Sequence, residues 1–229
     1  MDIKDLAEVP CTWKPTENEG KLLKKFKKII EDKYNIKLDG YWGLHQWSVD
    51  HIPELWAEMW DFAGIISSKK FDKVIDLNTP LEKFPVWFTG AKLNLAENLL
   101  KYRDDKIAYI VTGESRRTEK VTFAEVYKEA ELYAAAFRKF GLNKGDVVTC
   151  QMSNRKEAIF AMIAVTSIGG IWAGALPLLG AKAVLNRFKL IEPKVFLTID
   201  QVIENKKSID MFPKIKEIAE GLPSLEKLL

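Results

Sequence analysis

The chain has 229 residues, of which 47% are hydrophobic and 29% are charged, and its formal net charge is +3. This composition is ordinary for a soluble globular protein with one large or two small domains. So small a charge gives no indication of nucleic-acid binding. The sequence has no run of 18 uninterrupted apolar residues, so no transmembrane segment is predicted.

The compartment is indicated by the N-terminus and the thiols. The first residues are followed by acidic Glu8 and by no apolar core, so no secretory signal is predicted. Cys11 and Cys150 lie far apart without CxxC spacing, and the only histidines are His45 and His51. We therefore expect reduced thiols, a cytosolic location and no metal site.

The N-terminal part begins with an extended arm over residues 1–20, followed by a helix over Lys21–Tyr34 in which apolar residues recur at helical spacing. The lysines of this helix form a basic face, which could lie on an anionic membrane or meet a partner helix. We favour a surface helix that docks on its own domain through Leu22, Phe26 and Ile30.

A second amphipathic helix is predicted over Ile52–Ala63, capped by Ser48 or Asp50. Its apolar stripe is expected in the core and consists of Leu55, Trp56, Met59, Trp60 and Phe62. Residues Ser67–Thr89 show no regular pattern, and a third helix is predicted near Asn94–Lys101. We also expect Trp87 in the core of this region, so that Trp87→Ala would leave a cavity and cost a few kcal/mol.

From Ile107 onward strands and helices alternate. The elements predicted there are a hairpin of Ile107–Thr112 and Lys120–Thr122, helix Phe123–Phe140, strand Val147–Met152, helix Asn154–Ile168, strand Ile171–Leu176, helix Ala181–Leu190, strand Lys194–Ile199 and a helix within Ser208–Glu220. Such alternation predicts a parallel sheet covered on both faces. The expected fold class is therefore α/β, a mainly helical N-terminal cap followed by an incomplete parallel βαβ sheet.

The alternation stops at Leu225–Leu229, where a further strand should begin. We therefore expect the chain to be cut rather than finished, and an unpaired apolar sheet edge invites self-association. A loop that cradles a triphosphate needs glycines with Ser, Thr and a lysine, and the chain has none. Gly169-Gly170 is predicted as a helix end, and His45 and His51 are predicted to pack rather than to exchange protons. The residues alone indicate no catalytic group.

The longest distinctive motif runs from Trp87 to Leu100, in the order WFTGAKLNLAENLL, and follows Trp47-Ser48-Val49 and Leu55–Trp60. This tryptophan-rich block resembles the N-terminal cap of acetoacetyl-CoA synthetases, a branch of the AMP-forming acyl-CoA synthetases. The match continues from about Trp42 to the C-terminus, through Thr122-Phe123, Ser153-Asn154, Ser167–Trp172 and Arg187-Phe188.

The resemblance implies three segments: an arm with the basic helix at 1–40, the cap at 41–104, and a truncated beginning of the AMP-binding domain at 105–229. It also implies an acid–thiol ligase that makes an acyl-adenylate from ATP and acetoacetate and passes the acyl group to CoA. ATP, Mg²⁺ and CoA are the cofactors implied, a small acyl acid is the substrate, and sterol and fatty-acid synthesis the destination. The phosphate loop and catalytic lysine of the family are expected beyond this segment, so we expect the chain alone to be inactive.

One binding position is implied by related acetate ligases, in which a basic stretch after the third strand holds the nucleotide end of CoA. The matching residues are Glu204–Lys207, so Lys206 and Lys207 could pair with CoA phosphates, although two exposed lysines are more often a solvated surface. Arg187 could serve the CoA path or a structural ion pair. Glu204 stands where a basic residue is expected, and Leu178-Leu179 stand where an acidic–aromatic pair is expected.

Three functions stay open at this point. The first is the N-terminal part of an acetoacetate–CoA ligase. The second is a non-catalytic short isoform or pseudoenzyme that binds a partner through its sheet edge or basic helix. The third is part of a ligase for acetate or propionate.

Overall fold

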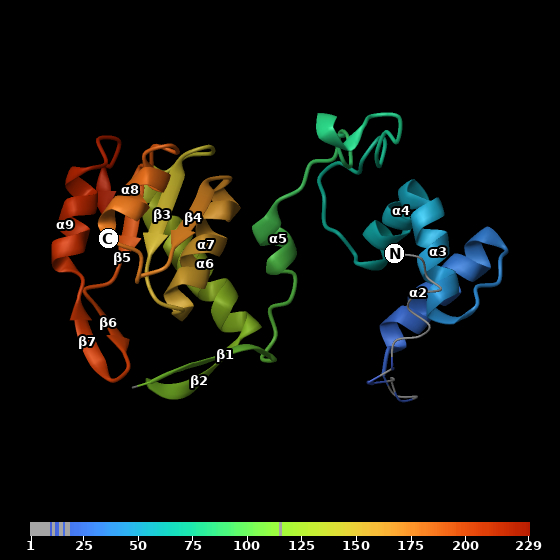
Figure 1. Cartoon of the computed structure of the whole chain (residues 1–229), viewed down its shortest axis with the longest axis horizontal. Helices are drawn as coiled ribbons and strands as arrows, with labels where there is room; N and C mark the ends of the chain where they lie inside the picture. The colour runs from blue at the N-terminus through green and yellow to red at the C-terminus, as the bar shows by residue number, and fades with distance from the viewer. Residues whose placement is uncertain (1–9, 11, 14–15, 17–18, 115) are drawn as a thin grey trace. The chain divides into compact units, whose positions relative to one another are not determined.

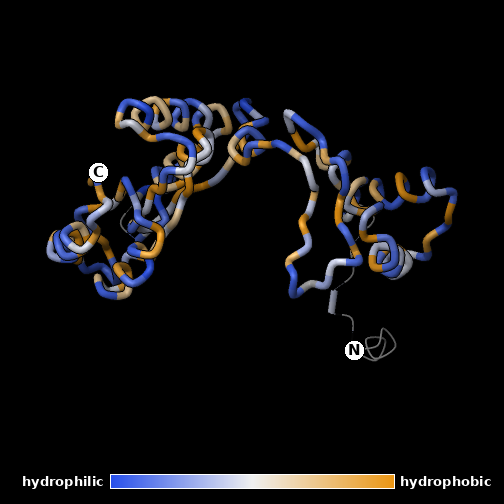
Figure 2. The backbone as a smooth tube through the Cα atoms, turned by 90° about the horizontal axis from the view of Figure 1, so that it is seen from above, coloured by the Kyte–Doolittle hydropathy of each residue, from blue (hydrophilic) through white to orange (hydrophobic). Residues whose placement is uncertain are grey.

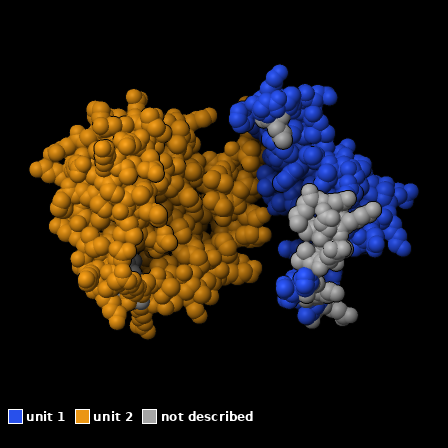
Figure 3. Space-filling model, viewed as in Figure 1, with its two compact units in different colours: residues 1–65, 70–91 blue, residues 66–69, 92–229 orange. Residues whose placement is uncertain are grey.

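The structure, a computed structural model, describes residues 10, 12–13, 16, 19–114 and 116–229. Most of the predicted arm, residues 1–20, lies outside them. The chain divides into two compact units (Figure 3), the first formed by residues 1–65 and 70–91 and the second by residues 66–69 and 92–229. Along the helices of both units, hydrophilic and hydrophobic residues alternate (Figure 2), as amphipathic helices require.

The first unit is helical (Figure 1) and contains α2 (Lys21–Tyr34), α3 (Gly40–Asp50), α4 (Ile52–Phe62) and the 3₁₀ turn η1 (Leu81–Lys83). Its core cluster consists of Phe26, Ile30, Leu44 and Trp47, surrounded by partly buried side chains of α2, α4 and the segment between α2 and α3. The predicted helix Lys21–Tyr34 is confirmed, and the irregular stretch after α4 holds no regular element longer than η1 among the described residues.

Helix α2 docks on its own unit through two of the three predicted side chains. Phe26 and Ile30 are buried, whereas Leu22 is 72% exposed, so the prediction for Leu22 is wrong. Leu22 lies in the first turn of the helix, and the packed face begins one turn later.

Helix α3 was not predicted, and the capping prediction for the next helix is wrong because of it. Ser48 and Asp50 lie inside α3, and the Ser48 hydroxyl donates to the carbonyl oxygen of His45 at 2.7 Å. Helix α4 instead begins after His51 without a side-chain cap, and Pro53 stands in its first turn, where a missing N–H costs nothing.

The tryptophans of the first unit divide into two kinds. Trp60 is buried between Phe71 and Phe88, with ring centroids 5.2 and 4.9 Å away. Trp56 and Trp87 meet edge to face at 5.8 Å but remain 42% and 43% exposed. The prediction that both lie in the core is wrong, because solvent still reaches about two fifths of each residue.

The second unit opens with α5 (Leu95–Leu99), which Asn94 caps by accepting from the N–H of Glu97. The hairpin of β1 (Ile107–Gly113) and β2 (Arg116–Thr122) follows, antiparallel as predicted. The remaining elements are α6 (Phe123–Lys139), β3 (Val147–Gln151), α7 (Lys156–Ile168), β4 (Ile171–Ala175), α8 (Ala181–Phe188), β5 (Val195–Thr198), β6 (Gln201–Glu204), β7 (Lys207–Asp210), α9 (Phe212–Glu220) and β8 (Lys227–Leu228).

The central sheet is parallel and has the strand order β4-β3-β5-β8. Side chains of β5 alternate between its two faces. Val195 and Leu197 pack with residues of α6 and α7, and Phe196 packs with residues of α8 and α9. The sheet is therefore covered on both faces, and the predicted α/β class is confirmed.

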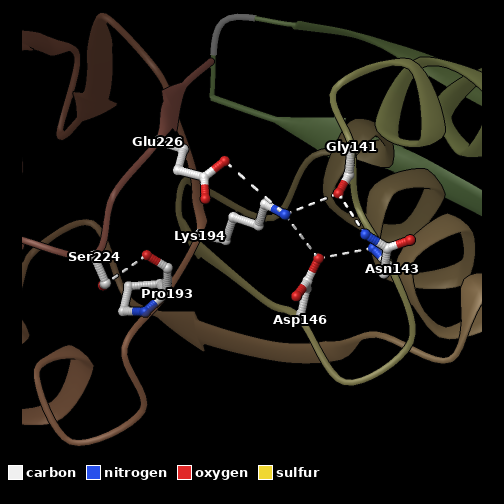
Figure 4. A network of polar contacts seen from close by, with 7 residues as sticks. All are labelled: Gly141, Asn143, Asp146, Pro193, Lys194, Ser224 and Glu226. Carbon is white, nitrogen blue, oxygen red and sulfur yellow. Dashed lines mark hydrogen bonds and ion pairs between the residues drawn. The ribbon is translucent and has the colours of Figure 1, made fainter.

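A polar network holds the amino ends of the strands together (Figure 4). The Lys194 ammonium donates to the carbonyl oxygen of Gly141 at 2.8 Å and to Asp146 at 3.1 Å, and it lies 3.9 Å from Glu226. The backbone N–H of Asn143 and the Lys194 ammonium both lower the pKa of Asp146. One lysine thus ties together the segments that lead into β3, β5 and β8.

Candidate functional site

The carboxyl edge of the sheet contains a topological switch. The chain leaves β3 through α7, on one face, and leaves β5 by way of α9, on the other face. In open α/β sheets, ligands bind outside the carboxyl ends of strands at such a point. A pocket of about 310 Å³ lies there, lined among others by Met152, Arg155 and Asp200.

Three polar side chains of this pocket have partners within the protein. The Arg155 guanidinium makes two contacts with the Glu157 carboxylate, at 3.1 and 3.4 Å. The hydroxyl of Thr198 donates to the carbonyl oxygen of Gln151 at 3.1 Å. The pocket can hold a polar group, although Arg155, Glu157 and Thr198 already have partners within the protein.

Gln151 fixes the loop that follows β4. Its side-chain amide is fully buried and donates to the carbonyl oxygens of Leu176 and Leu179, both at 3.0 Å. Its Oε1 has no hydrogen-bond partner among the described residues. The sequence signal that could have identified this residue is a glutamine at the last position of a strand that is predicted to be buried.

The hairpin β6–β7 leads away from the carboxyl end of β5 and was not predicted. Its two-residue turn is Asn205-Lys206, and both residues have positive φ, 50° and 62°. The Glu114 carboxylate accepts the backbone N–H groups of Asn205 at 3.2 Å and of Lys206 at 2.8 Å. The side chains of Lys206 and Lys207 are exposed, and Lys207 pairs with Glu204 across the ladder.

Arg187 lies apart from these lysines. Helix α8 runs from the carboxyl end of β4 to the amino end of β5, and Arg187 is in its last turn. Its Nη1 donates to the carbonyl oxygen of Ala183 at 2.7 Å. The structure therefore brings Lys206 and Lys207 together on one turn and leaves Arg187 near the opposite edge of the sheet.

One histidine and one cysteine that could support catalysis are held in packing roles. The His51 ring stacks on Trp47 at 5.0 Å, and its Nδ1 lies 3.1 Å from the carbonyl oxygen of Trp47. Burial raises the pKa of the Cys150 thiol to about 11, which keeps it protonated and unreactive at neutral pH. Cys11 lies outside the described residues.

Two negative findings concern the described part of the chain. No three His, Cys, Asp or Glu side chains there are grouped so as to hold a metal ion. No helix there combines the length and apolar character needed to cross a membrane.

An adenylate-forming enzyme domain is the class that this covered parallel sheet and helical N-terminal unit match, and the family comparison gives the same answer. Residues 95–228 match the family of AMP-binding enzymes, and residues 41–99 match the N-terminus of acetyl-coenzyme A synthetase. The chain belongs to the AMP-binding enzyme family. The expected resemblance to AMP-forming acyl-CoA synthetases is confirmed.

Three similar proteins are acetoacetyl-CoA synthetases. The chain is 39% identical to the acetoacetyl-CoA synthetase of Xenopus tropicalis over 229 residues, covering 99% of this chain and 34% of that protein. It is 37% identical to the acetoacetyl-CoA synthetase of Danio rerio over 228 residues, with the same coverage. A solved acetoacetyl-CoA synthetase from Streptomyces lividans matches with a TM-score of 0.83 and 27% identity, covering 99% of this chain and 34% of that one. The chain thus spans about a third of the length of these relatives.

Proposed function

We propose that this chain is part of an acid–CoA ligase that acts on acetoacetate. The observation that carries the proposal is the similarity to acetoacetyl-CoA synthetases along 99% of the chain. In the proposed reaction the acid and ATP form an acyl-adenylate and pyrophosphate, and the CoA thiol then displaces AMP. Because the chain spans 34% of the first relative, we assign adenylation to the part of the protein that the chain does not span.

The proposal divides the chain into an arm and basic helix at 1–40, a cap at 41–104 and the beginning of the AMP-binding domain at 105–229. The family matches over residues 41–99 and 95–228 support the order of the last two segments, with the AMP-binding match beginning ten residues before position 105. A cytosolic location belongs to the same proposal, in keeping with the free thiol of Cys150.

Among the cofactors, only CoA receives a binding position in this chain. Lys206 and Lys207 are exposed neighbours on a turn, and lysine ammonium groups bind phosphates as mobile point charges. They would hold the phosphates at the nucleotide end of CoA. Arg187, which donates to its own helix, is not needed for this contact. ATP and Mg²⁺ are assigned to residues outside the chain.

Calorimetric titration of the 229-residue protein with CoA at low ionic strength tests the binding position. We expect the pair Lys206→Ala and Lys207→Ala to weaken CoA binding about fivefold, since each exposed ion pair is worth at most about 1 kcal/mol. The matched control is the pair Lys182→Ala and Lys189→Ala, which removes the same charge from exposed positions elsewhere. If the two double variants weaken CoA binding equally, the proposal that CoA binds at the β6–β7 hairpin is refuted.

The reaction is tested by acetoacetate-dependent exchange between ATP and pyrophosphate. The 229-residue chain alone should give none, and a longer protein that contains it should respond to acetoacetate more than to acetate or propionate. A longer protein that prefers acetate or propionate would move the assignment to a neighbouring ligase. Exchange by the 229-residue chain would overturn the assignment of adenylation.

A second candidate function is a non-catalytic protein of the same family that works by binding a partner. The observation that favours it is the loop after β4, where Leu178 is 59% exposed at one of the two positions at which an acidic–aromatic pair is expected. Cross-linking and mass measurement of the native protein distinguish the two candidates. A 229-residue species in a stable hetero-complex would support the second.

A further inference from the structure

Two hairpin tips that are distant in sequence meet in the second unit. Glu114 directly follows β1, and its carboxylate accepts the backbone N–H groups of Asn205 and Lys206 in the β6–β7 turn, at 3.2 and 2.8 Å. Figure 1 shows the ends of the two hairpins side by side. The contact joins residues 91 and 92 positions apart, so nothing local to either hairpin requires it.

The conformation of the turn makes it an anion-binding cradle. Asn205 and Lys206 both have positive φ, which is the backbone of a type I′ hairpin turn, where asparagine followed by glycine is preferred. Successive N–H groups of such a turn form a concave nest that binds an anion. The second position here is a lysine, which the left-handed region disfavours, so an anion in the nest also stabilises a costly turn.

The charges at the tip suit an anion with more than one negative oxygen. Lys206 is itself one of the two residues of the turn, and Lys207 is the next residue along the chain. Both side chains are exposed, and the ladder holds two acidic residues, Glu204 opposite Lys207 and Asp210 at its far end, opposite Gln201. Backbone N–H groups and lysine ammonium groups are the kinds of donor that proteins present to phosphate groups, and this turn offers two of the first and is followed or formed by two residues that carry the second.

We infer that the β6–β7 turn is a phosphate-binding nest that Glu114 occupies as an internal ligand. A phosphate group of an incoming ligand and the Glu114 carboxylate then compete for the same two N–H groups. Glu114 lowers the affinity of the turn for phosphate and keeps the turn folded when no phosphate is bound. For CoA this inference rests on the proposed function, whereas for inorganic pyrophosphate it stands alone.

Amide NMR spectra of the 229-residue protein, titrated with inorganic pyrophosphate at low salt, test the nest directly. We expect the amide signals of Asn205 and Lys206 to shift, and Glu114→Gln to bind pyrophosphate about tenfold more tightly than the wild type, since a charge-assisted hydrogen bond is worth more than a neutral one. The control is Asp105→Asn. It removes one exposed carboxylate just before the β1–β2 hairpin, which also carries Glu114, and leaves the β6–β7 turn unchanged. It should change the affinity less than twofold.

A second variant covers the case in which the turn opens once Glu114 is neutral. Lys206→Gly gives the turn the Asn-Gly sequence that adopts this conformation unaided. The double variant of Glu114→Gln with Lys206→Gly keeps the nest without its internal ligand. It should also bind pyrophosphate more tightly than Lys206→Gly alone.

The outcomes separate this inference from the proposed CoA site. Equal pyrophosphate affinities with and without the Glu114 carboxylate, in both backgrounds, would overturn the nest. Pyrophosphate shifts that map away from Asn205 and Lys206 would also overturn it. If Glu114 and pyrophosphate compete for the turn but CoA does not bind, the inferred nest is supported and the proposed CoA site is refuted. If CoA binding depends on Lys206 and Lys207 but not on Glu114, the proposed CoA site is supported and the inferred nest is refuted.

Discussion

The contrast between two tryptophans of the helical unit gives the sharpest test of its packing. Trp60 is 7% exposed and touches Phe71 and Phe88, whereas Trp87 is 43% exposed and touches Trp56 at its edge. Trp60→Ala removes a buried ring from a closed aromatic cluster, and we expect a loss of about 3–5 kcal/mol in the free energy of unfolding, the range for large aromatic deletions in cores.

For Trp87→Ala the expected loss is smaller. The ring is little more than half buried, and the space that it leaves opens to solvent, so no closed cavity forms. Only the transfer of the buried part is lost, about 1–2 kcal/mol. The sequence alone predicted a larger loss in the free energy of unfolding, because the partial exposure of Trp87 cannot be read from the sequence.

Urea unfolding followed by far-ultraviolet circular dichroism measures both variants, and amide hydrogen exchange in α3 and α4 shows that the helical unit is the part affected. The expected result is a loss that is larger for Trp60→Ala than for Trp87→Ala by about 1–4 kcal/mol. Equal losses, or a larger loss for Trp87→Ala, would refute the packing described for this unit.

Three further predictions concern single contacts. Lys206→Gly should raise the free energy of unfolding by about 0.5 kcal/mol, because relief of a left-handed lysine, about 1–2 kcal/mol, exceeds the added entropy of a glycine in the unfolded chain; a loss of stability would contradict this. Burial and the hydrogen bond to Glu58 raise the pKa of Tyr34 to about 12, so its contribution to stability is complete below pH 10 and disappears between about 10 and 12. The Tyr34 phenol, followed by its ultraviolet absorbance against a Tyr34→Phe reference, should titrate at a lower pH in Glu58→Gln, and an unchanged midpoint would exclude the contact. Lys194→Met should cost about 1–3 kcal/mol in thermal or urea unfolding and the control Lys189→Met almost nothing, whereas equal effects would deny Lys194 its role at the strand ends.

Long elements with a strong period could be predicted from the sequence. Helices α2 and α6 follow an apolar stripe at helical spacing, and α6 also begins with Thr122 and Glu125, which form a capping box. The strands β3 and β5 are short apolar runs between helices, and the structure pairs them in parallel. The α/β class follows from that alternation, without knowledge of any long-range contact.

The elements that escaped prediction lack such a period. Helix α3 has aromatic and apolar residues around much of its circumference, so no single stripe marks it as a helix. The strands β6 and β7 have four residues each and are joined by Asn205-Lys206 rather than by Asn-Gly. Short strands with an unusual turn give too weak a local signal.

The candidate site could be predicted only in part, because its contacts are long-range. Lys206 and Lys207 stand out as a basic pair after a strand, but the carboxylate that holds their turn belongs to a hairpin 92 residues away from Lys206. Gln151 likewise acts on a loop 25 and 28 residues further along. Neither contact leaves a periodic trace in the sequence, so only the folded chain reveals them.

The central claim is membership of a working acetoacetate–CoA ligase, and one measurement on the native protein tests it. The protein is purified from its source with an antibody against residues 21–60, sized by immunoblot, and assayed for AMP formation that requires both acetoacetate and CoA. The account predicts a species much larger than 26.2 kDa that forms AMP in response to acetoacetate. A purified protein of any size that forms no AMP with acetoacetate, ATP and CoA would contradict it.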